Sequence, residues 1–201
     1  MSLPLIQQLT VQKGATYIRK VFWETDTILY RPITGITKAA PARVTAVGHA
    51  IPDGWRAVVV SAGGMEDINC PRQIPKDSDW HTVTVVDADT VDLDGVNAAD
   101  YDAYTSGGYL LLYAPKDLAG YTARMTIKDK VGGTELLSLT TENGGIEVNN
   151  TTKAITITIS TALSEAISWT KGVYSLELVS NTNVVTTILS GTVRVSSEIT
   201  T

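Results

Sequence analysis

One cysteine and two histidines are the residues of this sequence that come closest to a nucleophilic site. A thiol becomes a strong nucleophile when a neighbouring imidazole takes its proton, so Cys70 would act with His49 or His81. Nothing in the sequence brings these residues together, and their joint presence in a chain of 201 residues is explained by chance. His49, just before a Pro-Asp-Gly turn, is expected to make a structural hydrogen bond, and Cys70 to fill a small apolar space. We therefore predict no catalytic residues and no enzyme activity.

The run of aspartates between Asp87 and Asp94 has some likeness to a calcium-binding loop, because hard cations take several carboxylate oxygens. The spacing fails, since Val91 stands where a third ligand should be and no glutamate follows at the needed distance. We expect these carboxylates to be solvated at strand ends and turns. The double glycines of the chain are not followed by Gly-Lys-Ser or Gly-Lys-Thr, which a phosphate-binding loop requires. The sequence thus predicts neither a metal site nor a cofactor.

Composition and charge narrow the remaining function classes. The chain is 43% hydrophobic and 18% charged, which is typical of a globular protein, and no apolar run approaches the roughly 20 residues that span a bilayer. Its net charge of −5 and its scattered basic residues argue against nucleic-acid binding, which needs clustered Lys and Arg. The first residues lack the features of a secretory signal, and the single cysteine fits a reducing compartment. We expect a protein that folds in a cytoplasm, with no membrane and no nucleic acid among its partners.

Alternating apolar and polar residues predict strands most clearly in the C-terminal half. The period of two runs through Tyr121–Lys128, Ile155–Ser160 and Thr192–Ser196, whose β-branched residues suit a half-buried pleated surface. The double glycines 132–133 and 144–145 separate strand-like runs, as at hairpin turns. The fold class that this pattern predicts is all-β.

One short helix is predicted, between Ser160 and Ser168. Ser160 or Thr161 can cap its first turn, and apolar residues such as Ala162 and Leu163 recur at helical spacing. We interpret the resulting apolar stripe as a cover for the core at one end of a sandwich.

The middle of the chain differs in composition from its two ends. The stretch Gly14–Trp23 is typical of one long strand, whereas prolines and glycines divide the residues after Ile36 into short strands and tight turns, as in a small barrel. The expected short strands are Val44–Val47, Ala57–Ser61, Thr82–Val86, Thr90–Leu93 and Leu110–Tyr113. The first strand has no local partner, so we expect the two ends of the chain to meet. The prediction is a discontinuous β-sandwich of residues 1–34 and 114–201 that carries an inserted small β-barrel of residues 35–113.

Aromatic side chains supply the candidate interaction residues. Their rings anchor protein interfaces or stack on sugars at low entropic cost, and here they gather in the predicted barrel and on the Gly14–Trp23 strand. The candidates are Tyr17, Trp23, Trp55, Trp80, Tyr101 and Tyr104. The alternative for the barrel aromatics is that they fill its core, and their exposure decides between the two. The extreme termini of the chain are further candidate contacts.

Several motifs follow one another in a fixed order between residues 36 and 109. They are Ile36-Thr-Lys-Ala-Ala-Pro-Ala-Arg-Val-Thr-Ala-Val-Gly-His-Ala-Ile-Pro-Asp-Gly-Trp55, Gly64-Met-Glu-Asp-Ile-Asn69, Val86-Asp-Ala-Asp-Thr-Val-Asp-Leu93 and Tyr104-Thr-Ser-Gly-Gly108. This series resembles a small β-barrel module of tailed-bacteriophage structural proteins. That module is similar to the first catalytic-cysteine half-domain of ubiquitin-activating enzymes, which does no chemistry of its own. The resemblance therefore gives Cys70 no catalytic role.

A second series of motifs lies in the outer region. It consists of Asp117-Leu-Ala-Gly-Tyr-Thr-Ala-Arg-Met-Thr-Ile-Lys128, Gly172-Val-Tyr-Ser-Leu-Glu-Leu178 and Leu189-Ser-Gly-Thr-Val-Arg-Val195. It resembles the immunoglobulin-like domain at the N-terminus of some baseplate upper proteins and in many small phage tail or virion proteins. In the usual pattern a strand like Gly14–Trp23 runs almost directly into the Asp-Leu-x-Gly-Tyr-Thr-Ala-Arg core, whereas here the barrel intervenes. The resemblance implies that the sandwich is immunoglobulin-like.

Together the two resemblances imply a non-enzymatic structural component of a tailed-phage virion, associated with the tail or baseplate or exposed on the capsid. Such a protein assembles in the host cytoplasm and acts through contacts with other virion proteins, as a homo-oligomer in a symmetric particle. The alternative is a receptor- or carbohydrate-binding surface module that uses the barrel aromatics to hold a host surface glycan. A cysteine hydrolase is the third class, and it requires Cys70 and a histidine side by side in a cleft.

Overall fold

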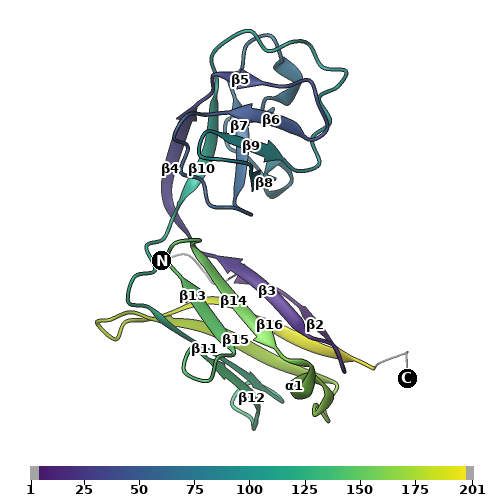
Figure 1. The fold of residues 1–201 in the computed structure, drawn as a ribbon. Helices are drawn as coiled ribbons and strands as arrows, with labels where there is room; N and C mark the ends of the chain where they lie inside the picture. Colours follow the sequence, from purple (N-terminus) through teal and green to yellow (C-terminus); the bar gives the residue numbers. More distant parts are fainter. Residues whose placement is uncertain (1–4, 198–201) are drawn as a thin grey trace. The chain divides into compact units, whose positions relative to one another are not determined.

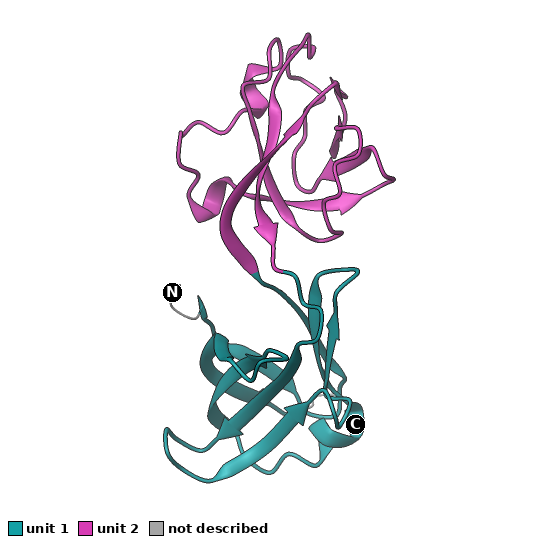
Figure 2. Cartoon of the chain, turned by 90° about the vertical axis from the view of Figure 1, so that its left-hand side faces the viewer, with its two compact units in different colours: residues 1–23, 117–201 teal, residues 24–116 magenta. Residues whose placement is uncertain are grey.

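The chain folds into two compact units, which Figure 2 shows in teal and magenta. The structure is a computed structural model that describes residues 5–197. The first unit combines the residues up to Trp23 with those from Asp117 onward, and the second unit is formed by Glu24–Lys116. Strands make up 49% of the chain and helical turns 6%, so the predicted all-β class is confirmed. The predicted contacts of the extreme termini fall outside the described residues.

The larger sheet of the first unit has six strands in the order β1–β16–β15–β11–β12, with β2 also paired to β16. Its strands are β1 (Leu5–Ile6), β2 (Leu9–Gln12), β11 (Thr122–Lys128), β12 (Glu135–Thr140), β15 (Lys171–Val179) and β16 (Val185–Ser196). Alternate residues of β11 and β15 are buried, which is the period of two that the sequence showed. The sheet therefore presents one apolar face.

A three-stranded sheet covers this apolar face. Its order is β13 (Ile146–Asn149), β14 (Ala154–Ile159) and β3 (Tyr17–Phe22), and β14 is antiparallel to both neighbours. Ile155 and Ile157 of β14 are fully buried in one core with Met125 and Leu176 of the larger sheet. Figure 1 shows the two sheets as layers of one sandwich.

The strands nearest the two ends of the chain lie side by side. β2 pairs in parallel with β16, so that Leu9 lies opposite Val193 and Val11 opposite Val195. Leu9 and Val11 are buried in the core of the sandwich, at 2% and 0% exposure. This confirms the expectation that the ends of the chain meet.

Between β1 and β2 the backbone passes very close to β16 at Gly191. The Gln7 amide donates to the Ser190 carbonyl at 2.8 Å, and the Tyr174 hydroxyl donates to the Gln7 carbonyl at 3.0 Å. A Cβ on Gly191 would lie 2.0 Å from that carbonyl oxygen, and Gly191 has a φ of +151°. The position therefore requires glycine.

The helix is shorter than predicted, and its buried residue is the polar Ser164. α1 spans Thr161–Glu165, and the Ser160 hydroxyl caps it by accepting from the Leu163 amide at 3.3 Å. Leu163 is 43% exposed, whereas Ser164 is fully buried and its hydroxyl donates to the Ala15 carbonyl at 2.8 Å. The predicted apolar stripe is confirmed only at Ile167, which follows α1 and is buried in the core of the sandwich. It is wrong for Ala162, Leu163 and Ala166, which are exposed.

The two double-glycine turns have different roles. Gly132, at φ +73°, lies in the hairpin between β11 and β12, as predicted. Gly144 also has a positive φ, +74°, but there the chain passes from β12 in the larger sheet to β13 in the smaller one. The Asn143 side chain accepts from the amides of Thr140 and Gly145 at 2.8 and 2.9 Å. The second turn is thus a crossing between layers and not the predicted hairpin.

The second unit is one sheet of seven strands, in the order β4–β10–β7–β8–β9–β6–β5. Its elements are β4 (Glu24–Pro32), β5 (Gly35–Ile36), β6 (Ala42–Thr45), β7 (Arg56–Val60), η1 (Glu66–Ile68), η2 (Asp77–Asp79), β8 (His81–Val85), β9 (Thr90–Leu93) and β10 (Tyr109–Pro115). The outermost strands, β4 and β5, follow one another in the chain, so the sheet curls back on itself into a barrel-like body (Figure 1). Its short strands match those predicted, with small shifts of their bounds.

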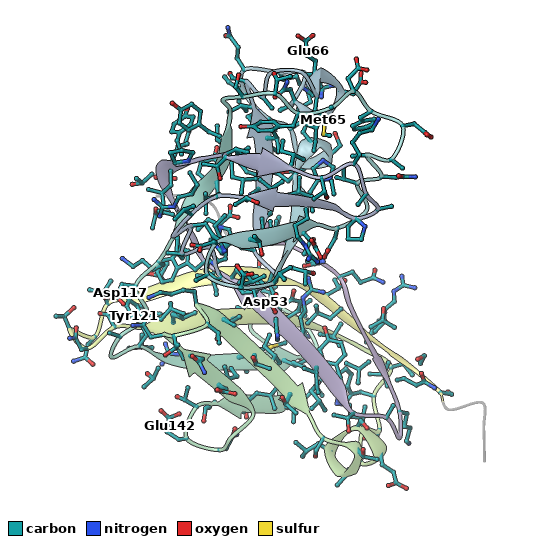
Figure 3. All side chains as sticks on the ribbon, turned by 45° about the horizontal axis from the view of Figure 1, so that its top comes forward. Asp53, Met65, Glu66, Asp117, Tyr121 and Glu142 are labelled. Atoms are coloured by element: carbon teal, nitrogen blue, oxygen red, sulfur yellow. The ribbon has the colours of Figure 1, made fainter. Side chains whose placement is uncertain are left out.

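The barrel-like unit has its own apolar core. Trp55, Met65, Leu93, Leu110 and Leu112 are among its largest fully buried side chains. In Figure 3, Met65 points into the unit and the neighbouring Glu66 points to solvent.

The boundaries of the units lie at 23/24 and 116/117, whereas the sequence predicts them at 34/35 and 113/114. The difference is β4, which pairs with β10 from Glu24 to Pro32 and so belongs to the second unit. The polar start of β4, Glu-Thr-Asp-Thr, lacks the apolar alternation by which the other strands were recognised.

Substituting Gly191 with alanine is expected to detach the N-terminal strands, because the new Cβ collides with the Gln7 backbone. We expect a loss of about 3 kcal/mol in the free energy of unfolding, measured in urea, and faster amide exchange in Leu9–Gln12. The control is Gly144→Ala, where φ is also positive but no atom lies within 4 Å of the added Cβ. Its cost should be about 1 kcal/mol. Equal costs for the two variants would contradict the role given to Gly191.

The buried hydroxyl of Tyr174 makes the first unit sensitive to alkaline pH. Burial raises the pKa of Tyr174 to about 12 from its ordinary 10.0. The protonated form therefore stabilises the fold fully below pH 10, and this contribution is lost as the pH rises from 10 through 12. We expect the thermal unfolding midpoint to fall over that interval, and to fall less in Tyr174→Phe than in the exposed control Tyr30→Phe. An identical fall in both variants would show that Tyr174 is not responsible.

Candidate interaction surfaces

Trp55 fills the core of the second unit and is not a surface contact. Its side chain is 1% exposed, and its indole N–H donates to the Tyr113 carbonyl at 3.0 Å. This corrects its choice as a candidate interaction residue. The physical reason is that a small barrel-like body needs a large side chain in its interior, and Trp55 supplies it together with a buried hydrogen bond.

Tyr104 and Tyr101 are half-buried, and the first is used to hold a turn. The Tyr104 hydroxyl lies 3.1 Å from the Ile33 carbonyl oxygen and 2.9 Å from that of Gly107. Its polar end is therefore satisfied within the unit, as expected for a ring that locks a loop. Tyr101 lies in a turn in which its amide donates to the Ala98 carbonyl at 3.2 Å.

Trp80 is half-buried against residues of its own unit. Its ring centroid lies 5.4 Å from that of Tyr113, and the guanidinium carbon of Arg56 lies 4.9 Å from the Trp80 ring. Arg56 donates from Nε and Nη2 to the two carboxylate oxygens of Glu24, each at 2.6 Å. The hydrogen bond to Glu24 is the main cause that raises the pKa of Arg56. Trp80 thus presents only part of its ring, on a cation–π stack that is fixed by an ion pair.

The most exposed aromatic residues of the second unit were missed by the sequence analysis or left out of its candidates. Tyr30 is 53% exposed and Tyr109 43%, and their rings meet edge to face with centroids 5.9 Å apart. Ile28, 43% exposed, shares the Tyr30 face of β4, since the two are separated by one residue. The run Ile28-Leu29-Tyr30 before Pro32 is the signal that could have shown this strand and its face.

Tyr17 is the first residue of β3, Trp23 follows its last residue, and both pack against the sandwich core. Burial raises the pKa of Tyr17, which is half-buried. Trp23 meets Tyr121 edge to face at 5.8 Å between centroids. Asp117 and Tyr121, both labelled in Figure 3, lie in the segment that leads into β11. The two candidates therefore help to seat β3 on the sandwich, and the outward surface of this strand is formed by other residues.

β3 is an edge strand of the three-stranded sheet. It pairs with β14 alone within the described residues, with Arg19 opposite Ile157 and Lys20 opposite Thr156. Arg19 faces the inside of the sandwich, where its guanidinium donates to the Gln7 side-chain oxygen. On the opposite face, Ile18 is 64% exposed and Lys20 is exposed. An unpaired edge with an exposed apolar side chain is a ready template for another strand.

His49 has a structural role. Its side chain is 2% exposed, its Nδ1 accepts from the Ile51 amide, and its Nε2 lies 2.9 Å from the Asp87 carbonyl oxygen. Both ring nitrogens are thus used by backbone groups, as the sequence analysis expected. The backbone amide of Cys70 donates to the Val59 carbonyl at 2.7 Å. The pKa of His81 is lowered, and burial is the main cause.

The aspartates of the 87–94 run each bind a different partner. The Asp87 carboxylate accepts from the Asp89 amide at 2.8 Å, and this hydrogen bond is the main cause of its lowered pKa. Asp92 accepts from the Arg43 guanidinium at 2.7 and 3.0 Å, which lowers the pKa of its carboxyl. Within residues 5–197 no group of three or more His, Cys, Asp or Glu side chains is placed to hold a metal ion.

No protein-family model matches this chain, and no curated protein matches it in sequence. In the part of the chain that the structure describes, none of the helices is long and apolar enough to cross a membrane.

Proposed function

We propose that this chain is a non-enzymatic structural subunit of a tailed-phage particle, placed at the tail or baseplate or on the capsid surface. The observation that carries the proposal is where the sandwich is interrupted. The second unit ends at Lys116, and Asp117 is the first residue of the motif that resembles phage immunoglobulin-like domains. The interruption therefore falls where the resemblance expects β3 to run directly into that motif.

The surfaces of both units support a role in protein–protein contact. The first unit offers the edge of β3 that pairs with no strand of residues 5–197, and the second offers the exposed face of Ile28, Tyr30 and Tyr109. Edge strands and exposed apolar patches are the features by which β proteins join other subunits. The partners we propose are other virion proteins and further copies of this chain, in a symmetric assembly.

Mass spectrometry of purified particles tests this function directly. Particles of the phage or prophage that encodes the chain should contain it in many copies, and it should remain bound after a wash that removes loosely attached host proteins. A cryo-EM map of the same particles should then accommodate the two units as separate bodies. Absence of the chain from intact particles would reject the proposal.

The exposed aromatic face gives a second candidate function, the binding of a host surface glycan by the second unit. Tyrosine rings that are about half exposed and held edge to face offer flat surfaces on which sugar rings stack. On a glycan array, the chain should retain a glycan, and the double variant Tyr30→Ala with Tyr109→Ala should lose most of that binding. Tyr101→Ala is the matched control, because it removes a half-buried tyrosine ring of the same unit that is not part of the Tyr30–Tyr109 pair. If no glycan is retained, this candidate is rejected and the structural role is untouched.

A further inference from the structure

We propose that the three-stranded sheet of one copy continues into that of the next copy, through parallel pairing of β3 with β13 of the neighbour. The inference rests on the proposed function and deepens it, because it names a second copy of this chain as the partner. β3 and β13 are the two edges of the sheet, and neither pairs with a further strand within residues 5–197. A sheet with two free edges is extended by copies of itself in head-to-tail order.

The register fixes which backbone groups of β3 point outward. The Thr158 amide donates at 2.9 Å to the carbonyl of Gly145, so Thr158 directs its backbone groups to the β13 side. Groups alternate along a strand, so the residues on either side of Thr158 direct theirs to β3. Ile157, the residue before Thr158, lies opposite Arg19. The backbone N–H and C=O groups of Arg19 therefore bond to β14. Ile18 and Lys20 direct their N–H and C=O groups away from the sheet.

The same alternation applies to β13. Glu147 lies two residues after Gly145 and directs its groups to β14, so Ile146 and Val148 direct theirs outward. In a parallel pair, a residue whose backbone groups point to the neighbouring strand faces one residue of that strand. Its N–H and C=O bond to the residues just before and just after that facing residue. With Lys20 facing Glu147 of the next copy, the Lys20 amide donates to the Ile146 carbonyl and the Lys20 carbonyl accepts from the Val148 amide. The two edges are thus complementary in their backbone groups.

The side chains on the outer face are complementary in the same register. Glu147, Thr156 and Lys20 lie in one row across the sheet. Continuing this row into a second copy places the exposed Lys20 beside the exposed Glu147 of that copy. Opposite charges on neighbouring strands stabilise the pairing, and Arg19 does not compete because it points into the sandwich toward Gln7.

A two-fold pairing of β3 with β3 of a second copy is the main competitor, and like charges disfavour two of its registers. In an antiparallel pair, outward-directed residues face one another. A register that pairs Ile18 with Lys20 sets Arg19 opposite Arg19, and one centred on Lys20 sets this lysine opposite itself. The register centred on Ile18 pairs Lys20 with Thr16, which lies before β3 begins. The lateral repeat is the arrangement that pairs opposite charges and uses both free edges.

Cysteine cross-linking tests the pairing in the full chain. Opposed residues of neighbouring strands lie about 5 Å apart, within the reach of a disulfide. In a Cys70→Ser background, we expect a mixture of the Lys20→Cys and Glu147→Cys chains to form disulfide dimers on oxidation. Each variant alone should cross-link no faster than Glu165→Cys, an exposed control on α1. Dimers from Lys20→Cys alone would indicate the two-fold pairing and overturn the proposal, and so would a mixture without cross-links.

Charge reversal supplies an independent readout, because it measures association without oxidation. Lys20→Glu or Glu147→Lys should each weaken self-association roughly tenfold in sedimentation experiments, and the double variant should recover it. Glu165→Lys is the control for a change of charge alone. A double variant that stays as weak as the single ones would overturn the proposed register. Presence of the chain in particles is measured separately, so particles that contain a chain without this pairing would reject the inference and leave the proposed function standing.

Discussion

The parallel pairing of β2 with β16 determines how the first unit is assembled. It brings residues near the start of the chain against residues near its end, and it buries Leu9 and Val11 in the sandwich core. Parallel strands cannot be joined by a tight turn, so a long connection between them is unavoidable. Since the entropic cost of closing a loop grows only slowly with its length, the connection can contain a whole folded unit.

The second unit meets the requirements of such an insertion through its own two outer connections. The chain enters through β4 and leaves through β10, and these strands are antiparallel neighbours with Glu24 opposite Pro115. The entry and exit of the unit are therefore adjacent, which is the condition under which domain insertions are tolerated. In residues 5–197 the strands of each unit pair with strands of the same unit, and the core around Met125 consists of residues of the first unit. The insertion therefore requires only that the chain of the sandwich be interrupted between β3 and β11.

Much of this fold could be predicted from the sequence, because periodicity reports burial directly. β11 and β14 were recognised by alternation that the structure reproduces residue by residue. β4 could not be predicted in full, because its first residues are polar. The strand that follows the turn at Gly144 could not be assigned to a sheet either, because a positive φ does not determine with which strand the next one pairs. α1 shows the same limit, since Ser164 is buried by a hydrogen bond to Ala15, which is distant in sequence. Long-range partners of this kind leave no local pattern.

Surfaces were harder to predict than strands, because an aromatic residue type is compatible with both core and surface. Trp55 is buried and Tyr30 is exposed, although both are aromatic residues of the second unit. The edge of β3 shows what the structure adds. Lysine on an edge strand discourages pairing with an edge of like charge, which protects the monomer from unspecific aggregation. The same Lys20 favours pairing with an edge strand that carries an acidic side chain. β13 carries such a side chain, Glu147, in the same row across the sheet. One side chain can therefore both block unsuitable strands and select a suitable one, and this dual effect follows from charge and register together.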